Sequence, residues 1–156
     1  MPPYMFLDSR SSTSLFCTME PHYPVHYQKL ESHQYWFVSV GKRNVIKCVQ
    51  FSILDAHSKL YNLSLMDLDL HLNMLSDNAI TDNGDTIRIL KTVAFCVQVF
   101  LNKEENTKVY FVGNSPARNR LYRMYIYNYQ YLWDEFFLCE CDKKSDVEFG
   151  FYFTKK

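Results

Sequence analysis

The chain has 156 residues, and its 17 Lys and Arg equal its 17 Asp and Glu, so the formal net charge is zero. This balance gives no reason to expect general affinity for nucleic acid, and an anion site would have to come from local clustering of cations. A hydrophobic share of 47%, with 12 Tyr and 12 Phe against 4 Gly, is typical of packed layers rich in strands.

The ends and the cysteines indicate a protein of the reducing cytoplasm. Residues 1–16 lack a basic start followed by an apolar stretch, and the five cysteines are odd in number. The longest apolar run, residues 93–97, is far shorter than the roughly 20 residues of a membrane span, so we expect no membrane association. Residues 1–20 have two prolines and a Ser/Thr run, which predicts a flexible or wrapping extension before a single domain over residues 21–156.

Hydrophobic patterns predict eight elements along the domain. In chain order they are strands at 35–40, 45–54 and 60–70, a helix from a cap at Asp82 or Asn83 to about Lys103, a strand at 108–112, a helix from 116 to about 131, and strands at 135–141 and 147–153. We read residues 73–83 as a polar turn. The order βββ-α-β-α-ββ predicts an α+β domain with a mixed sheet and the helices packed on one face.

The first helix is expected to be largely buried. Asp85 falls in its predicted first turn, where a carboxylate suits the helix dipole. One apolar stripe follows the helical period and is widened by neighbouring Val, Phe and Cys residues; it consists of Ile87, Leu90, Ala94, Val97 and Leu101.

The turn that leads into the second helix has the features of an anion site. Gly113 turns the chain after a buried strand, Ser115 is a natural N-cap, and Pro116 suits the first helical position. The first N–H groups of a helix are unpaired, and the helix dipole adds about half a positive charge there. Three arginines, Arg118, Arg120 and Arg123, follow within two turns.

These arginines support two interpretations. In the first, Gly113, Ser115, Arg118, Arg120 and Arg123 bind a phosphate-bearing ligand or nucleic acid, because guanidiniums beside aromatic rings suit phosphate and ring stacking. Helical spacing places Arg118 in line with Tyr122, Tyr125 and Tyr129, and Arg120 and Arg123 with Tyr127; Lys42, Arg43 and Lys47 of the first hairpin would add charge. In the second, the arginine stems cover aromatic surface and pair with Asp134 or Glu135. The segment lacks the G-x-x-x-x-G-K-[ST] pattern, which excludes a nucleotide-hydrolysing P-loop.

Residues 109–124, Val-Tyr-Phe-Val-Gly-Asn-Ser-Pro-Ala-Arg-Asn-Arg-Leu-Tyr-Arg-Met, resemble the signature of an uncharacterised family of small bacterial proteins. In that family a strand is followed by G-S-T-x-A-R-T-R-L-Y-x-M. Residues 40–42, 62–67, 82–85 and 91–94 are similar as well, so the resemblance covers roughly residues 23–153. The sequence departs at Asn114, Ser115 and Asn119, where the family usually has Ser, Thr and Thr. The resemblance implies no established activity.

Two other clusters contain residues that can bind metal. Asp67, Asp69 and His71 alternate, so they could project from one face of a strand as oxygen and nitrogen ligands of a divalent metal. The alternative is a solvent-facing stripe, with Met66, Leu68, Leu70 and Leu72 facing the core. Cys139 and Cys141 share a strand face, but no further ligands occur at zinc-site spacing, which favours a structural role.

Three functional hypotheses follow. The first is a binding module for a phosphate-bearing ligand or nucleic acid at residues 113–123. The second is a protein-interaction or homo-oligomerising role, as in an accessory protein of a stress or defence operon; the run of Tyr residues from 122 to 131 is typical of a contact surface. The third is a metal-dependent hydrolase that uses Asp67, Asp69 or His71. We rank the two binding roles above catalysis and expect no cofactor.

Overall fold

The computed structural model describes residues 21–76, 83–113, 115–143 and 149–156. Its strands are β1 (His26–Lys29), β2 (His33–Val40), β3 (Asn44–Asp55), β4 (Leu60–Asp69), β5 (Met74–Ser76), β6 (Lys108–Phe111), β7 (Phe137–Lys143) and β8 (Phe149–Lys155). Its helices are α3 (Thr86–Lys103), α4 (Pro116–Asn128) and the short 3-10 helix η1 (Gln130–Leu132). Within these ranges no helix is long and apolar enough to cross a membrane.

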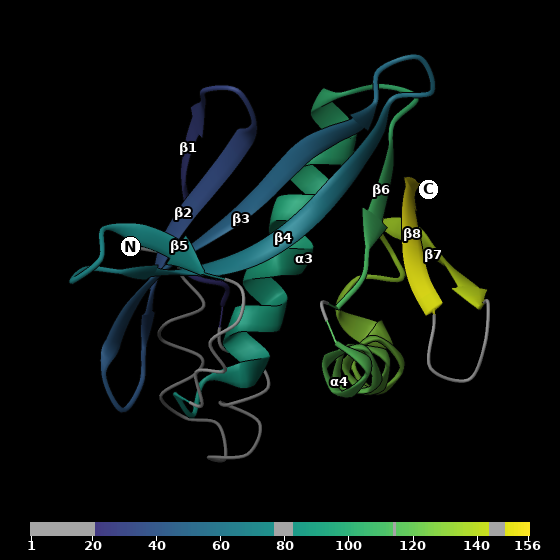
Figure 1. Cartoon of the computed structure of the whole chain (residues 1–156). Coiled ribbons are helices and arrows are strands. Elements are labelled where there is room, and N and C mark those ends of the chain that lie inside the picture. Colours follow the sequence, from purple (N-terminus) through teal and green to yellow (C-terminus); the bar gives the residue numbers. More distant parts are fainter. Residues whose placement is uncertain (1–20, 77–82, 114, 144–148) are drawn as a thin grey trace, which may run out of the picture.

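The strands form one curved sheet in the order β1-β2-β3-β4-β6-β8-β7, with β5 paired to β4 (Figure 1). Neighbouring strands are antiparallel except for β4 and β6, which are parallel. A parallel pair needs a long crossover, and α3 provides it because it lies between β4 and β6 in the chain. The predicted α+β class with a mixed sheet is therefore confirmed.

The predicted order of elements is incomplete, because β1 and β5 are additional strands. β1 has the sequence His-Tyr-Gln-Lys, which lacks an apolar alternation, and it forms by pairing with the edge of β2. β5 has three residues and returns along β4 after a turn in which Asn73 has a φ of 51°. The predicted turn over residues 73–83 is thus wrong at Met74–Ser76, and residues 77–82 lie outside the described ranges.

The core lies between the sheet and α3. Tyr35, Phe37, Val49, Phe51 and Leu63 occupy alternate positions on one face of β2, β3 and β4, and all are buried. Against them α3 presents its buried face, which consists of Thr92, Cys96, Val97, Phe100 and Leu101. The rings of Phe51 and Phe100 stack with their centroids 4.2 Å apart. The predicted helical stripe shares only Val97 and Leu101 with this face, because Leu90 and Ala94 line an open space beside α4 instead.

The start of α3 differs from the prediction. Its N-cap residue is Asp85, which makes no side-chain cap hydrogen bond. Asn83 instead binds the β2–β3 turn: its Oδ1 accepts from the Arg43 N–H at 2.9 Å and its Nδ2 donates to the Arg43 carbonyl at 2.7 Å. The contact is so close that a Cβ at Gly41 would lie 1.8 Å from the Asn83 carbonyl oxygen. Asn83, just before α3, thus holds the β2–β3 hairpin against the start of the helix.

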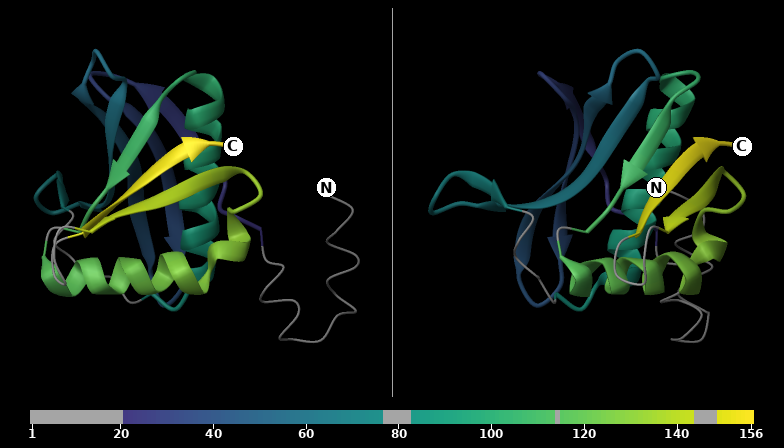
Figure 2. Two further views of the ribbon diagram at one scale, coloured as in Figure 1. Left: turned by 90° about the vertical axis from the view of Figure 1, so that its right-hand side faces the viewer. Right: turned by 45° about the vertical axis from the view of Figure 1, so that its right-hand side comes forward.

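The two long helices pack differently. Helix α3 lies along one face of the sheet, whereas α4 runs crosswise to it at the foot of the sheet, below β6, β7 and β8 (Figure 2). The prediction that the helices pack on one face of the sheet is therefore correct for α3 and wrong for α4. The crosswise helix leaves space between itself, α3 and the sheet, and the candidate site lies there.

Candidate functional site

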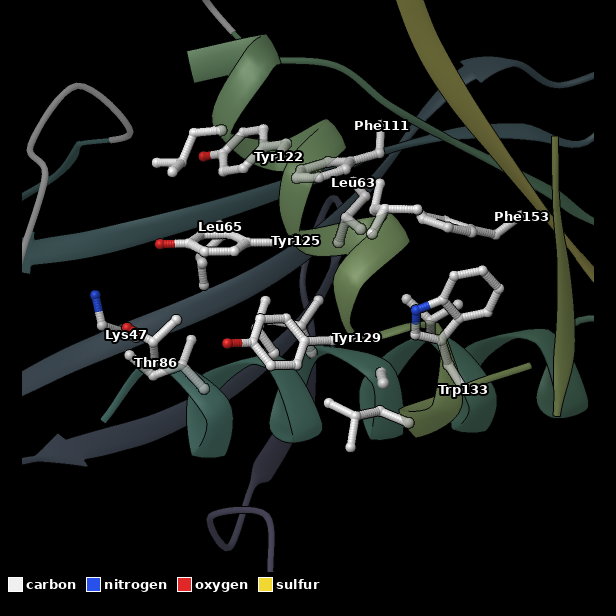
Figure 3. A pocket seen from close by; sticks show the side chains of 18 of the residues that line it. Lys47, Leu63, Leu65, Thr86, Phe111, Tyr122, Tyr125, Tyr129, Trp133 and Phe153 are labelled. Carbon is white, nitrogen blue, oxygen red and sulfur yellow. The ribbon is translucent and has the colours of Figure 1, made fainter. Parts of the chain in front are cut away.

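An open cavity of about 200 Å³ lies between α3, α4 and the sheet. Its lining is mostly apolar. The sheet contributes Leu63 and Leu65 of β4, Phe111 of β6 and Phe153 of β8, and α3 contributes Val93 and Val97. Figure 3 shows these surroundings, with α4 forming one wall. A concave apolar site with a few polar groups is the usual form of a small-molecule site.

The wall contributed by α4 is aromatic. Tyr122, Tyr125 and Tyr129 are spaced at helical intervals of three and four residues, so they share one face of the helix, and all three line the cavity. Figure 3 shows their hydroxyl groups on the side where Lys47 lies, with Trp133 and Phe153 toward the other end. The cavity thus has a polar end and an apolar end. In contrast, Tyr127 and Tyr131 are exposed.

An ion pair marks the polar end. Lys47 on β3 and Asp67 on β4 are paired across the two neighbouring strands. Lys47 Nζ donates to Asp67 Oδ1 at 2.5 Å. Both side chains are largely buried, with 6% and 14% of their surfaces exposed. Removing two charges from water is costly, so a buried pair is weak evidence for a purely stabilising role. Here it supplies a cation and a carboxylate to a mostly apolar cavity.

A second cavity of about 210 Å³ adjoins the first at the carboxyl end of β6. It is lined by β4 residues 62–65, by Val112 and Gly113, and by Arg118 and Tyr122, which also line the first cavity. Among the described residues, the charged side chains that line the two cavities are Lys47, Asp67 and Arg118. Two cations against one carboxylate favour an anionic ligand.

The turn between β6 and α4 is held by two side chains. Ser115 is the N-cap of α4, as predicted, and its Oγ accepts from the Arg118 N–H at 3.2 Å. Asn119 is buried, and its Oδ1 accepts from the Gly113 N–H at 2.5 Å. A Cβ at Gly113 would lie 2.7 Å from the backbone nitrogen of Asn119, so only glycine fits there. These contacts fix the direction in which α4 leaves the sheet.

The structure separates the three arginines of the predicted phosphate site. Arg118 is half-buried and lines both cavities. Arg120 is exposed and lines neither. The guanidinium carbon of Arg123 lies 5.7 Å from the centre of the Tyr127 ring on another face of α4. Of the hairpin cations, Lys47 lines the first cavity, whereas the backbones of Lys42 and Arg43 bind Asn83 in the β2–β3 turn.

The three metal-site candidates, Asp67 and Asp69 of β4 and His71 in the turn after it, are not brought together. Asp67 pairs with Lys47, whereas Asp69 Oδ1 accepts from the backbone N–H groups of His71 and Leu72 at 2.9 and 3.1 Å. In the described part of the chain, no group of three or more His, Cys, Asp or Glu side chains is placed to hold a metal ion. The alternative interpretation is wrong for Leu70 and Leu72, which are 71% and 67% exposed instead of facing the core.

Burial makes three of the described thiols poor nucleophiles. It raises the pKa of Cys48, Cys96 and Cys139 to about 12, so these three are protonated near neutral pH. No described cysteine is in a disulfide, and Cys139 and Cys141 lie on β7 next to β8, away from the cavity lining.

Lys47 and the aromatic wall of the cavity differ in how far local patterns predict them. Lys47 shares a strand face with Val49 and Phe51, and a lysine on the apolar face of a strand indicates a buried charge that needs a partner. The line of tyrosines on α4 is visible in the sequence. Its role, however, depends on the crosswise position of α4, which no local pattern encodes.

The chain thus has an α+β fold with a crossover helix and an open cavity between α3, α4 and the sheet. The family of unknown function DUF6934 matches residues 19–151, and the chain belongs to that family. No curated protein and no solved structure matches the chain significantly. The predicted membership of an uncharacterised family is thus confirmed.

Proposed function

We propose that this domain is a binding module whose cavity takes a ligand with an apolar body and an anionic group. The observation that carries the proposal is the position of Arg118, which lines both cavities; the first of these also has an aromatic wall and a buried lysine. An apolar body gains affinity by leaving water, and a charged donor at one end fixes its orientation. A phosphate-bearing ligand is one member of this class.

Arg118 is the main recognition residue of this proposal. Its guanidinium has five N–H donors in a planar fork, so it can hold a protein group and a ligand oxygen at the same time. The N-terminus of α4 adds partial positive charge on the same side. Arg120 and Arg123 lie outside the cavities, and the chain has no net charge, so one compact anionic ligand is better supported than an extended nucleic acid.

The test uses anilinonaphthalene sulfonate, an aromatic probe with one sulfonate, titrated into the protein and followed by its fluorescence. We expect one site per chain, and Arg118→Ala should weaken binding about tenfold, the loss expected for one charge-assisted hydrogen bond. Arg120→Ala is the matched control, since it removes the same charge from an exposed position of α4. Equal losses in both variants would show that the arginines act only through overall charge.

Because the probe also binds partly unfolded proteins, each variant needs a stability check. The urea midpoints of Arg118→Ala, Arg120→Ala and the parent protein should agree before their affinities are compared. If Arg118→Ala bound more probe than the parent and unfolded at lower urea, the result would report lost packing instead of a lost ligand contact.

A second candidate function is protein association through the β4–β5 hairpin. This hairpin projects beyond the rest of the sheet (Figures 1 and 2), and its end has Leu70, Leu72 and Met74 at 71%, 67% and 60% exposure. Grouped exposed apolar side chains mark interaction sites. If these side chains join two copies of the chain, light scattering should give the mass of a dimer, and the double variant Leu70→Ser with Leu72→Ser should be a monomer. A monomeric parent protein would exclude self-association through this hairpin.

A further inference from the structure

The α4 wall of the first cavity presents a cation followed by a row of rings. Arg118, Tyr122, Tyr125 and Tyr129 succeed one another at intervals of three or four residues, and all four line the cavity. At a rise of about 1.5 Å per residue, Arg118 precedes Tyr122 by about 6 Å along the helix axis and Tyr125 by about 10.5 Å. A ligand whose anionic group contacts Arg118 therefore has its body beside these two tyrosines.

Further rings enclose the cavity from the sheet and from the segment after α4. Phe111 of β6 packs on Tyr122 with the ring centroids 4.7 Å apart, and Trp133 stacks on Phe137 at 5.2 Å. Phe137 in turn meets Phe153 of β8 edge to face at 5.3 Å, and all five residues line the cavity. Aromatic pairs favour centroid distances of about 4.5–7 Å in offset-stacked and edge-to-face arrangements. A ring in this cavity thus gains contacts that a saturated body of the same size lacks.

The size of the cavity suits one ring. The walls opposite the tyrosines are aliphatic and come from β4 and α3, with Leu63, Leu65, Leu90, Val93 and Ala94. An apolar cavity of about 150 Å³ is large enough to bind benzene. The first cavity has a volume of about 200 Å³, so it accommodates a ring together with a short linker.

The charges in the cavity favour a ligand with a single negative charge. The guanidinium of Arg118 is a planar fork of donors that matches the two oxygens of a carboxylate. Lys47 already donates to Asp67 at 2.5 Å, and the Asp67 carboxylate lines the same cavity. A phosphate dianion would bring a second negative charge into a mostly apolar site that contains this carboxylate, and the repulsion is stronger there than in water.

We propose that the ligand is an aromatic monocarboxylate, a single ring joined to its carboxylate by a short linker, with the carboxylate on Arg118 and the ring against the tyrosines of α4. The inference rests on the proposed function and narrows its ligand class, since the ring is the apolar body and the carboxylate is the anionic group. A rigid ring also loses less conformational freedom on binding than a flexible acyl chain, which favours the ring further.

The test displaces bound anilinonaphthalene sulfonate from the full chain at pH 8 with four matched compounds. 3-Phenylpropanoate has the proposed chemistry. 3-Cyclohexylpropanoate has a saturated ring, 3-phenylpropanamide lacks the charge, and 2-phenylethyl phosphate is a dianion at this pH. We expect 3-phenylpropanoate to act at concentrations about tenfold lower than the amide and about threefold lower than the other two compounds. If burial of apolar area alone decided affinity, the larger saturated ring would bind at least as well as the aromatic one.

Two pairs of variants assign these preferences to residues. Arg118→Ala should remove the advantage of the acid over the amide, whereas Arg120→Ala should preserve it. Tyr125→Leu should remove the advantage of the aromatic over the saturated ring, and Tyr127→Leu, at an exposed position of the same helix, is its control. The comparison of the four compounds on the parent protein needs no variant, so it decides the proposal even where a variant is unstable.

The outcomes separate the two proposals. If the probe binds through Arg118 but the saturated acid or the phosphate competes as well as 3-phenylpropanoate, the inference is wrong and the proposed function stands. The same holds if none of the four compounds displaces the probe. Equal effects of Tyr125→Leu and Tyr127→Leu on the ring preference would contradict the placement of the ring. If the probe fails to bind, or if Arg118→Ala and Arg120→Ala weaken it equally, both proposals fall.

Discussion

Removing one member of the Lys47–Asp67 pair should destabilise the domain strongly. The two charges are largely buried and 2.5 Å apart, so Lys47→Met removes the cation nearest to the Asp67 carboxylate in a mostly apolar cavity. Breaking a buried pair in this way costs about 3–5 kcal/mol. With a urea dependence of about 2 kcal/mol per molar, a loss of about 3 kcal/mol lowers the unfolding midpoint by about 1.5 M. Trp133, which lines the cavity, makes tryptophan fluorescence a suitable signal.

The matched variant removes both charges. Lys47→Met combined with Asp67→Leu should be more stable than Lys47→Met alone, because no uncompensated charge remains and apolar groups fill the space. Arg120→Met is the surface control and should shift the free energy of unfolding by less than about 0.5 kcal/mol. If Lys47→Met unfolded within the error of the parent midpoint, the pair would be solvated, and the polar end of the cavity would lose its structural basis.

Two further predictions concern the stability of the fold. Asn119→Ala should lower the free energy of unfolding by about 1–3 kcal/mol, because the buried side-chain Oδ1 of Asn119 accepts the hydrogen bond of the Gly113 N–H. A urea midpoint equal to that of the control Asn128→Ala, at an exposed position, would contradict this role. Stability should fall as the pH rises from about 8 to 11, since the pKa of Cys48 and Cys96 is raised to about 12 in the fold while unfolded thiols ionise near about 8.5. The folded state thus keeps protons that the unfolded state loses, and the pKa of Tyr23, raised by burial and by Asp85, adds to the same trend. Urea midpoints in reductant at pH 8 and 10.5 measure this decline, and a midpoint that is unchanged or higher at pH 10.5 would oppose it.

Local sequence signals predicted much of the fold. The hairpin of β2 and β3, the crossover helix α3 and the Ser115 cap of α4 each have a pattern within a few residues: alternation, helical periodicity, and Ser-Pro after Gly. These elements form where local preference and burial agree. The same agreement explains why the α+β class and the mixed sheet could be predicted.

The remaining elements depend on tertiary contacts. β1 and β5 are short strands without alternation, and they form because a longer strand offers an edge. Asn83 looked like a helix cap because Asn before a helical run often is one, yet its amide binds the β2–β3 turn 40 residues earlier. Such partners are distant in the chain, so no local rule could identify them.

The candidate site likewise has a part that local sequence patterns predicted and a part that depends on tertiary contacts. Helical spacing correctly grouped Arg118 with Tyr122, Tyr125 and Tyr129, apart from Arg120 and Arg123. The pairing of Lys47 with Asp67 required the register of β3 against β4, and the cavity required the crosswise packing of α4. The sequence therefore indicated Arg118 and the row of tyrosines, whereas the rest of the lining and its assembly around a cavity are properties of the fold.

The most direct test of the account is a nuclear magnetic resonance titration of the labelled protein with anilinonaphthalene sulfonate. We expect the largest shifts at backbone amides around the joined cavities, including Leu63, Leu65, Phe111 and Arg118, and unchanged signals at the hairpin end, Leu70–Leu72. Shifts confined to the Arg120 and Arg123 face of α4, or to the hairpin end, would contradict a ligand site between α3, α4 and the sheet.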